Sequence, residues 1–335
     1  MSVKYTVCET KPVSEVFGLM STLVWLLLMS PLLIAYPVFF ALFYYFPVLR
    51  LPLLGYLAWI FVIDRGALIT GRKSFFKSIY WNFPHWKGFA GYFPAKLVKT
   101  ADLDPTKKYL FGFHPHGLYG ISLFACCYNQ DQWLQQSMFP GIDLLVCTLP
   151  ANFYIPFWRD WLLSVGVGNS SAESIRYRIN NGDPGTGMVI AVGGQEEFRH
   201  MKPGTLDLVL KNRKGFVKIA IQTGVSLVPI LSFGENDLYE PIQNKKVKKV
   251  MNNVFYSLFK ASAPLIYGRW GTIIPKKKPI HVVVGRPLEI KEANPHPTPE
   301  EIDRVHKQYL DNMRQLYDDF KDIFHKDRAK DMTFV

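Results

Sequence analysis

The sequence has no charged residue from Val16 to Leu49. Within this run, residues 23–46 would form a helix about 36 Å long, enough to cross the hydrocarbon core of a bilayer. Arg50 interrupts the run, and the apolar residues 51–63 that follow would reach only about 20 Å as a helix. We therefore predict an N-terminal transmembrane helical hairpin, with a first leg that spans and a second leg that is either tilted or re-entrant.

The apolar run is too long for a cleaved signal peptide, and no small-residue cleavage pattern follows it. A buried core helix is the other alternative. Basic residues indicate the orientation, because Lys4 and Lys11 precede the hairpin, Arg65 follows it, and only Arg50 lies in its turn. The positive-inside rule then places both ends in the cytosol. We predict a membrane anchor over residues 1–65 and a cytosol-facing α/β domain over residues 66–335.

Cysteine is scarce, and the spacing of the four cysteines fits neither a disulfide framework nor a zinc site. Acidic residues are also few: 27 Asp and Glu stand against 39 Lys and Arg, for a net charge of +12. This excess of basic residues suits binding to anionic lipid headgroups or to substrate phosphates. Alternatively, the basic residues simply form a solvated surface. No nucleic-acid recognition motif accompanies the charge, so we expect no nucleic-acid partner.

Beyond the hairpin, short apolar runs alternate with helical stretches, which predicts an α/β domain with a mixed or mostly parallel sheet flanked by helices. Residues 171–180 and 215–223 are predicted to be helices. The clearest helix follows Thr298, with Pro299 at its first position and Glu301 completing a capping box. We assign this helix packing and no chemistry. The predicted strands are residues 108–113, 144–148, 188–192, 227–232 and 281–284.

Two histidines close the first of these strands. His114 and His116 flank Pro115 and precede Gly117, at the carboxyl end of a strand, where functional groups of open α/β sheets gather. A His-x-His pair could begin a metal site, but no nearby group completes a ligand set, so we expect no metal. The other interpretation is proton transfer, for which imidazole is suited near neutral pH.

A second strand runs into Gly193 and Gly194, followed by Gln195, Glu196 and Glu197. The glycines permit a tight turn that leaves backbone N–H groups free to face a developing oxyanion. The carboxylates could orient a histidine base. Together with the histidines, this pattern favours acyl transfer in which a neutral His takes a proton from an alcohol. A turn with surface glutamates is the plainer alternative.

Short segments in order along most of the chain resemble the acyl-CoA:diacylglycerol acyltransferase type 2 family, which includes monoacylglycerol and wax-alcohol acyltransferases. The N-terminal hairpin also fits that family. The matching segments are Tyr-Phe-Pro at 92–94, Leu-Val-Lys-Thr at 97–100, Phe-His-Pro-His-Gly at 113–117, Phe-Pro-Gly at 139–141, Val-Gly-Gly at 192–194, Pro-Gly at 203–204, Arg-Lys-Gly-Phe-Val at 213–217, Val-Pro at 228–229, Phe-Gly-Glu-Asn at 233–236 and Val-Val-Val-Gly at 282–285.

The resemblance implies a glycerolipid-acyltransferase-like fold, an acyl-CoA donor, a neutral-lipid acceptor, no cofactor, and an endoplasmic reticulum membrane or lipid-droplet location. It implies that His116 is the general base. Glu197 is its expected partner, although Glu196 stays open, and His114 is expected to shape the motif. Gly117, Gly193 and Gly194 are expected to shape the oxyanion site. Arg213 and Lys214 are candidates for binding the acyl-CoA, and Glu235 and Asn236 are candidates for the acceptor site.

Ile121 stands where related glycerophosphate acyltransferases carry an aspartate, five residues after the histidine. An orienting carboxylate must therefore come from elsewhere in the chain. We expect diacylglycerol as the acceptor, with monoacylglycerol or a long-chain alcohol as alternatives that the sequence does not separate. A non-catalytic lipid-binding protein and a metal-dependent lipid hydrolase are alternatives from other classes. A homo-oligomer is compatible with the sequence.

Overall fold

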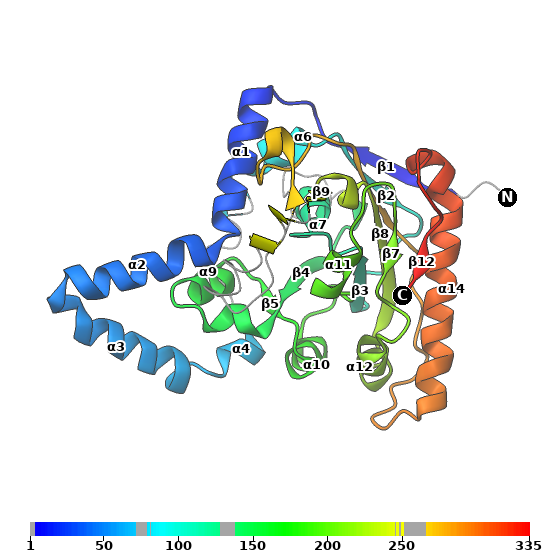
Figure 1. Ribbon diagram of the computed structural model, residues 1–335. Coiled ribbons are helices and arrows are strands. Elements are labelled where there is room, and N and C mark those ends of the chain that lie inside the picture. The colour runs from blue at the N-terminus through cyan, green and yellow to red at the C-terminus, as the bar shows by residue number, and fades with distance from the viewer. Residues whose placement is uncertain are drawn as a thin grey trace.

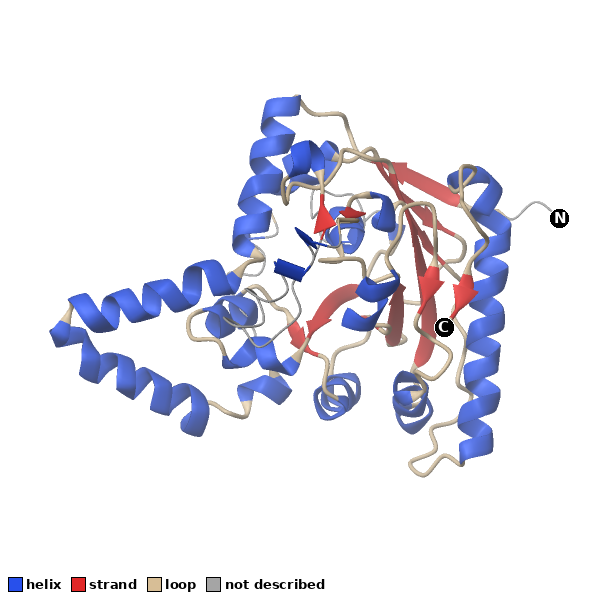
Figure 2. Ribbon diagram, viewed as in Figure 1, coloured by secondary structure: helices blue, strands red, loops and turns tan. Residues whose placement is uncertain are grey.

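The computed structural model describes residues 4–71, 79–80, 82–127, 138–244, 246–247, 249–250 and 266–335, except for the side chains of 31–33 and 127. A twisted eight-stranded sheet forms its centre, with helices on both faces (Figures 1 and 2). The strand order is β1-β2-β11-β8-β3-β6-β4-β5. These strands are β1 Thr6–Glu9, β2 Ala95–Lys99, β3 Tyr109–His114, β4 Asp143–Thr148, β5 Gly168–Asn169, β6 Thr186–Ala191, β8 Ser226–Phe233 and β11 Ile280–Val284.

The sheet is mixed and mostly parallel, as the sequence predicts. Strands β8, β3, β6, β4 and β5 run parallel to their neighbours in that order. Strand β11 is antiparallel to β8 and parallel to β2, and β1 closes the edge antiparallel to β2. Every residue of β3 and β8 is buried, which explains why both read as continuous apolar runs. Each of the five predicted strands is present, within two residues at either end.

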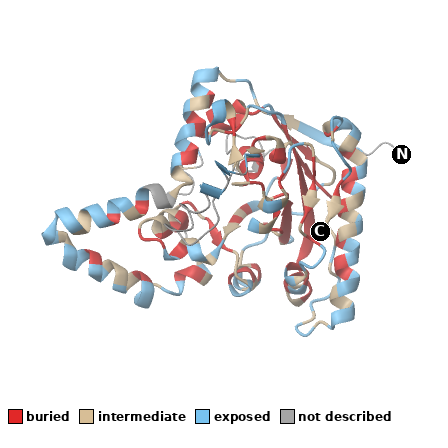
Figure 3. Ribbon diagram, in the orientation of Figure 1, coloured by how far each residue is buried: buried red, intermediate tan, exposed pale blue. Residues whose placement is uncertain are grey.

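Each face of the sheet carries its own apolar core. Helices α1, α6, α7 and α9 cover one face, and α10, α12 and α14 cover the other. Figure 3 shows these buried residues concentrated along the sheet. The helices are α1 Glu15–Leu28, α4 Ala67–Thr70, α6 His85–Tyr92, α7 Ile121–Cys127, α9 Trp158–Ser164, α10 Ala172–Asn181, α11 Gln195–His200, α12 Gly215–Thr223 and α14 Pro299–Phe324. Short strand pairs join β7 Asp207–Leu208 to β12 Thr333–Phe334, and β9 Glu240–Pro241 to β10 Ile266–Tyr267.

The three helices predicted from the sequence are confirmed. The C-terminal one, α14, begins at the predicted cap: the Thr298 side chain accepts a hydrogen bond from the backbone N–H of Glu301 at 3.2 Å, and Pro299 occupies the first turn. The Glu301 carboxylate accepts from the Asn294 side chain at 2.7 Å, and within the described residues the second bond of the predicted capping box is not formed. Its apolar positions lie at three- and four-residue steps, so one face packs against the sheet.

The prediction that residues 23–46 form a single helix is wrong. Helix α1 ends at Leu28, and α2 Pro31–Tyr45 begins after a break at Met29 and Ser30. Proline has no backbone N–H to donate, so Pro31 suits the first position of a new helix and disfavours continuation of the old one. After α2 come a 3₁₀ turn Pro47–Leu49, helix α3 Arg50–Ala58 and a π-helical turn Trp59–Ile63.

Helix α1 is a core helix of the α/β domain, the alternative that the sequence left open for the apolar run. Trp25 is fully buried and stacks on Phe89 of α6, with ring centroids 4.7 Å apart. A side chain on Gly88 would overlap Ser21, so the two helices pack closely there. Strand β1 likewise pairs with β2. The division at residue 65 stays a prediction, but β1 and α1 lie within the α/β domain.

Residues 31–63, which we call the arm, project from the domain as a V of two helical legs (Figure 1). Large apolar side chains cover it: Val48 and Leu51 are 80% and 81% exposed. Among the described residues, no single helix has the length and apolar composition needed to cross a bilayer. Ile34–Tyr45 and Pro47–Ile63 meet that requirement together, with a bend of 112° between them. The transmembrane hairpin therefore stays a prediction.

Candidate active site

Three neighbouring parallel strands deliver the polar residues singled out from the sequence. β3 ends at His114, β6 leads into Gly193 and Gly194, and β8 leads into Glu235. The carboxyl ends of parallel strands meet at one edge of the sheet. The three segments therefore converge at one edge, as expected for a catalytic site in this class of fold.

The Glu197 carboxylate lies at the centre of this edge. Its side chain is 1% exposed, and its Oε2 accepts a hydrogen bond from the backbone N–H of His116 at 2.6 Å. Its Oε1 accepts one from the backbone N–H of Val209 at 3.1 Å and lies 3.8 Å from Nδ1 of His114. The carboxylate thus fixes the backbone of the histidine motif.

The structure brings Glu197 to His114 and to the backbone of His116. Within the described residues, no hydrogen bond joins the carboxylate to the His116 ring, so the direct ring–carboxylate pair expected from the sequence is not formed. Nδ1 of His116 lies instead 3.0 Å from the carbonyl oxygen of Gly117. Because a carbonyl oxygen only accepts, Nδ1 of the neutral ring carries the proton, and the lone pair of Nε2 is free to accept one.

The two histidines differ in accessibility. His114 is fully buried, follows the strand directly and precedes a cis peptide bond to Pro115. His116 is half-buried. A base must touch the group whose proton it takes, and only the His116 ring is accessible from outside in this conformation. His114 is therefore placed behind the motif, and its expected role in shaping the motif stays a prediction.

Close packing against a carboxylate requires glycine at positions 117 and 193, and the backbone conformation favours glycine at position 194. A Cβ on Gly193 would lie 2.1 Å from the Glu197 carboxyl carbon, so any side chain there would displace that carboxylate. Gly117 has φ +59°, and its Cβ would lie 2.2 Å from Oε1 of Glu235. Gly194 has φ +57° and directly precedes α11. Gly117 and Gly193 let the carboxylates approach the backbone closely.

Glu196 and Glu197 differ in their position relative to the histidine motif. Glu196 is 41% exposed and pairs with Arg199 one turn along α11, at 3.4 Å. Glu197, the next residue of that short helix, is buried and faces the histidine motif. Glu197 is therefore the carboxylate in contact with the site.

Glu235 and Asn236, the acceptor-site candidates, are both buried. The Glu235 carboxylate accepts hydrogen bonds from the backbone N–H groups of Ile121 and Ser122, at 3.1 and 2.7 Å, and so caps α7 directly after the histidine motif. The Asn236 side chain donates to the carbonyl of Thr205 at 2.9 Å. Their polar groups thus hold neighbouring loops, and a role in binding an acceptor stays a prediction.

Burial raises the pKa of Glu235 from 4.5 to about 7, against the opposing effect of the hydrogen bonds that it accepts at Ile121 and Ser122. Between these values the folded protein binds a proton that the unfolded chain has released, so stability falls as pH rises from about 4.5 to 7. We expect Glu235→Gln to flatten this part of the curve of melting temperature against pH. Glu240→Gln is the control, because Lys276 lowers the pKa of Glu240. An unchanged slope in Glu235→Gln would contradict the assignment.

Arg213 and Lys214, the candidates for acyl-CoA binding, precede α12. Lys214 forms an ion pair with Asp303 of α14 at 2.5 Å, and Arg213 is exposed. Val209, four residues before Arg213, contacts the site, because its backbone N–H donates a hydrogen bond to Glu197. In the described part of the chain, neither basic side chain contacts the histidine motif, and their role stays a prediction.

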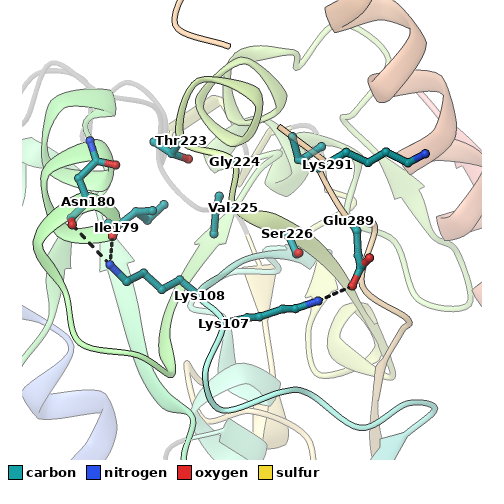
Figure 4. Close-up of a pocket in the computed structure, with 11 residues that line it drawn as sticks. Lys107, Lys108, Ile179, Asn180, Thr223, Gly224, Val225, Ser226, Glu289 and Lys291 are labelled. Carbon is teal, nitrogen blue, oxygen red and sulfur yellow. Dashed lines mark hydrogen bonds and ion pairs between the residues drawn. The ribbon is translucent and has the colours of Figure 1, made fainter. Parts of the chain in front are cut away.

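Two cavities lie away from the histidine motif. The first, of about 570 Å³, is at the amino ends of β3 and β8, the opposite edge of the sheet (Figure 4). Two of its three lining lysines are paired: Lys108 donates to the carbonyl of Ile179 at 2.6 Å, and Lys107 forms an ion pair with Glu289 at 2.7 Å. The second, of about 440 Å³, lies between the arm and α9 and has an apolar lining. It is formed by Leu28, Ile34, Ala35, Val38, Leu42, Phe157, Trp158 and Trp161.

Comparison with known proteins identifies the family. The sequence profile described as diacylglycerol acyltransferase matches residues 41–334. The chain belongs to this family. The resemblance seen in the motifs is thereby confirmed, and the protein is an acyltransferase.

Two relatives show the range within the family. Diacylglycerol O-acyltransferase 2A of Umbelopsis ramanniana is 40% identical over 94% of this chain and 89% of its own. The 2-acylglycerol O-acyltransferase 1 of Mus musculus is 36% identical over 79% of this chain and 80% of its own. The crystal structure of the 1-acyl-sn-glycerophosphate acyltransferase of Thermotoga maritima aligns with a TM-score of 0.38 and 12% identity, covering 79% of this chain and 96% of that one. That similarity is too low to support a functional inference.

Proposed function

We propose that this protein transfers a fatty acyl group from acyl-CoA to the free hydroxyl of diacylglycerol, forming triacylglycerol. The observation that carries the mechanism is the His116 ring, which is half-buried at the carboxyl edge of the sheet with Nδ1 hydrogen-bonded to the Gly117 carbonyl. This bond leaves Nε2 ready to act as a general base. Membership of the family supports the substrate class.

In the proposed reaction, Nε2 of His116 takes the proton of the acceptor hydroxyl as its oxygen attacks the thioester carbonyl. The tetrahedral intermediate collapses and expels the CoA thiolate, which recovers the proton from the imidazolium. No acyl group is attached to the enzyme. Backbone N–H groups near Gly117 or Gly193–Gly194 would stabilise the oxyanion. Arg213, exposed before α12, is the better placed of the two basic candidates for the CoA phosphates, because Lys214 is paired with Asp303.

Monoacylglycerol is the second candidate acceptor, since the mouse relative is a 2-acylglycerol O-acyltransferase, and a long-chain alcohol is the third. The test supplies radiolabelled acyl-CoA to membranes containing the protein and offers each acceptor separately. Labelled triacylglycerol formed only with diacylglycerol is the expected product. A chain in which His116→Ala has been made serves as the blank. Labelled diacylglycerol as the main product would identify monoacylglycerol as the acceptor. Labelled wax ester would identify a long-chain alcohol.

We further propose that the arm holds the protein in the endoplasmic reticulum membrane with the α/β domain in the cytosol. The exposed apolar side chains of the arm and the apolar cavity beside it support this. Replacing residues 31–63 by a Gly-Ser linker, with β1 and α1 retained, should let alkaline carbonate release most of the protein from membranes. Deleting residues 1–63 is the poorer experiment, because it also removes an edge strand and the buried Trp25.

Full-length protein in the carbonate supernatant would contradict the membrane-spanning arm. Carbonate-resistant binding by the protein without its arm would place the attachment elsewhere in the chain. The melting temperature of the detergent-purified variant checks that the α/β domain still folds. Activity towards diacylglycerol presented in detergent micelles separates loss of anchoring from loss of the site.

A further inference from the structure

Helix α14 contributes a polar group to the site, although its sequence indicates packing alone. The hydroxyl of Tyr309 lies 3.2 Å from Nε2 of His114 and 3.3 Å from the carbonyl oxygen of Gly112. Tyr309 is fully buried. A Cβ on Gly112 would lie 2.2 Å from this hydroxyl, so the strand has room for the hydroxyl only because residue 112 is glycine.

The direction of the hydrogen bond follows from the groups around the His114 ring. Burial, and secondarily the nearby Glu197, raise the pKa of Tyr309, so the hydroxyl keeps its proton. That proton can go to the Gly112 carbonyl or to Nε2 of His114. On the other side of the ring, Nδ1 faces Oε1 of Glu197 at 3.8 Å and, among the described residues, has no hydrogen-bond partner.

If the hydroxyl donates to Gly112, Nε2 carries the ring proton and the lone pair of Nδ1 faces the negative carboxylate. If it donates to Nε2, the ring proton sits on Nδ1 and faces Glu197. The second arrangement places a positive hydrogen, and not a lone pair, against the carboxylate. It is therefore the more stable of the two.

We propose that Tyr309 is a positioning residue for the acyl transfer, acting through His114 and Glu197 on the backbone that carries His116. The inference rests on the proposed function of His116. The chain of contacts runs from Tyr309 to Nε2 of His114, from Nδ1 to Glu197, and from Glu197 to the His116 N–H. It ties the last helix of the fold to the end of β3, across 195 residues of sequence.

Tyr309→Phe removes the hydroxyl and keeps the ring, which packs edge-on against Phe216 with centroids 4.9 Å apart. We expect kcat to fall about tenfold, because a buried ring nitrogen loses its hydrogen bond and the ring loses its fixed tautomer. The KM values for acyl-CoA and diacylglycerol should change less than about twofold, since Tyr309 does not touch either substrate in this proposal. Steady-state kinetics in diacylglycerol micelles gives both quantities.

Tyr317→Phe is the matched control. Tyr317 lies on the same helix, is fully buried, and donates its hydroxyl proton to Asp331 at 3.0 Å, away from the histidines. Both variants lose one hydroxyl from a buried tyrosine of α14, and the melting temperature of each measures the resulting loss of stability. Only Tyr309→Phe should lower kcat.

A double-mutant cycle separates positioning from general destabilisation. In a His114→Ala background, Tyr309→Phe should change kcat less than about twofold, because the group it acts on is gone. Tyr317→Phe should leave kcat unchanged in either background. Two results would overturn this inference alone, provided that the wild type is active. One is a wild-type kcat in Tyr309→Phe. The other is a tenfold fall in kcat when Tyr309→Phe is added to His114→Ala. A wild type that transfers no acyl group would overturn the proposed function itself.

Discussion

Replacing His116 with alanine is expected to lower turnover by about 10²–10⁴-fold, the usual contribution of a positioned proton-transfer group. The Gly117 carbonyl holds Nδ1 of His116 and leaves Nε2 free, on a ring that is half-buried at the edge of the sheet. Alanine removes the base but leaves the backbone N–H that Glu197 binds. The fold and the membrane attachment should therefore survive. Initial rates with saturating acyl-CoA and diacylglycerol give the comparison.

His296→Ala is the control for a lost imidazole, because His296 is exposed and far along the chain from the motif. It should keep wild-type turnover. His114→Ala should cost less than His116→Ala, because His114 is buried and acts on the motif from behind. Turnover within about twofold of wild type in His116→Ala would end the assignment of His116 as the base.

The strands and the C-terminal helix could be predicted from the sequence because their signals are local. Strands β3 and β8 are buried on both faces, so they appear as unbroken apolar runs bounded by breakers. The break between α1 and α2 has no such signal. Residues on both sides of it are apolar, and Pro31 is equally acceptable inside a kinked membrane helix. The packing of Trp25 on Phe89, a contact between segments far apart in sequence, holds α1 on the α/β domain.

The sequence predicted which segments form the site, but it did not predict which of their atoms are in contact. The histidine motif and the double glycine stand out because they follow strands. The contact that Glu197 makes depends on the backbone path after Pro115, which places the His116 N–H, and not its ring, against the carboxylate. Tyr309 could not be found from periodicity, because it occupies a normal core position of an amphipathic helix.

Replacing Glu197 with glutamine should lower turnover by about 10²-fold without unfolding the protein. The two carboxylate oxygens each accept a backbone N–H, from His116 at 2.6 Å and from Val209 at 3.1 Å. An amide of the same shape presents one oxygen and one NH₂ group, so one buried N–H donor faces another donor. Losing a hydrogen bond to a charged acceptor costs about 1.5–3 kcal/mol, which corresponds to about 10- to 150-fold if the loss falls on the transition state.

The matched control is Glu196→Gln on the same short helix, whose carboxylate is 41% exposed and pairs only with Arg199 among the described residues. It should keep turnover within about twofold of wild type. Because Glu197 acts by placing the His116 backbone, adding Glu197→Gln to His116→Ala should cost little more than His116→Ala alone. Full activity in Glu197→Gln together with an inactive Glu196→Gln would move the supporting carboxylate one residue back. Additive losses in the double variant would show that Glu197 acts on the reaction by a route that does not pass through His116.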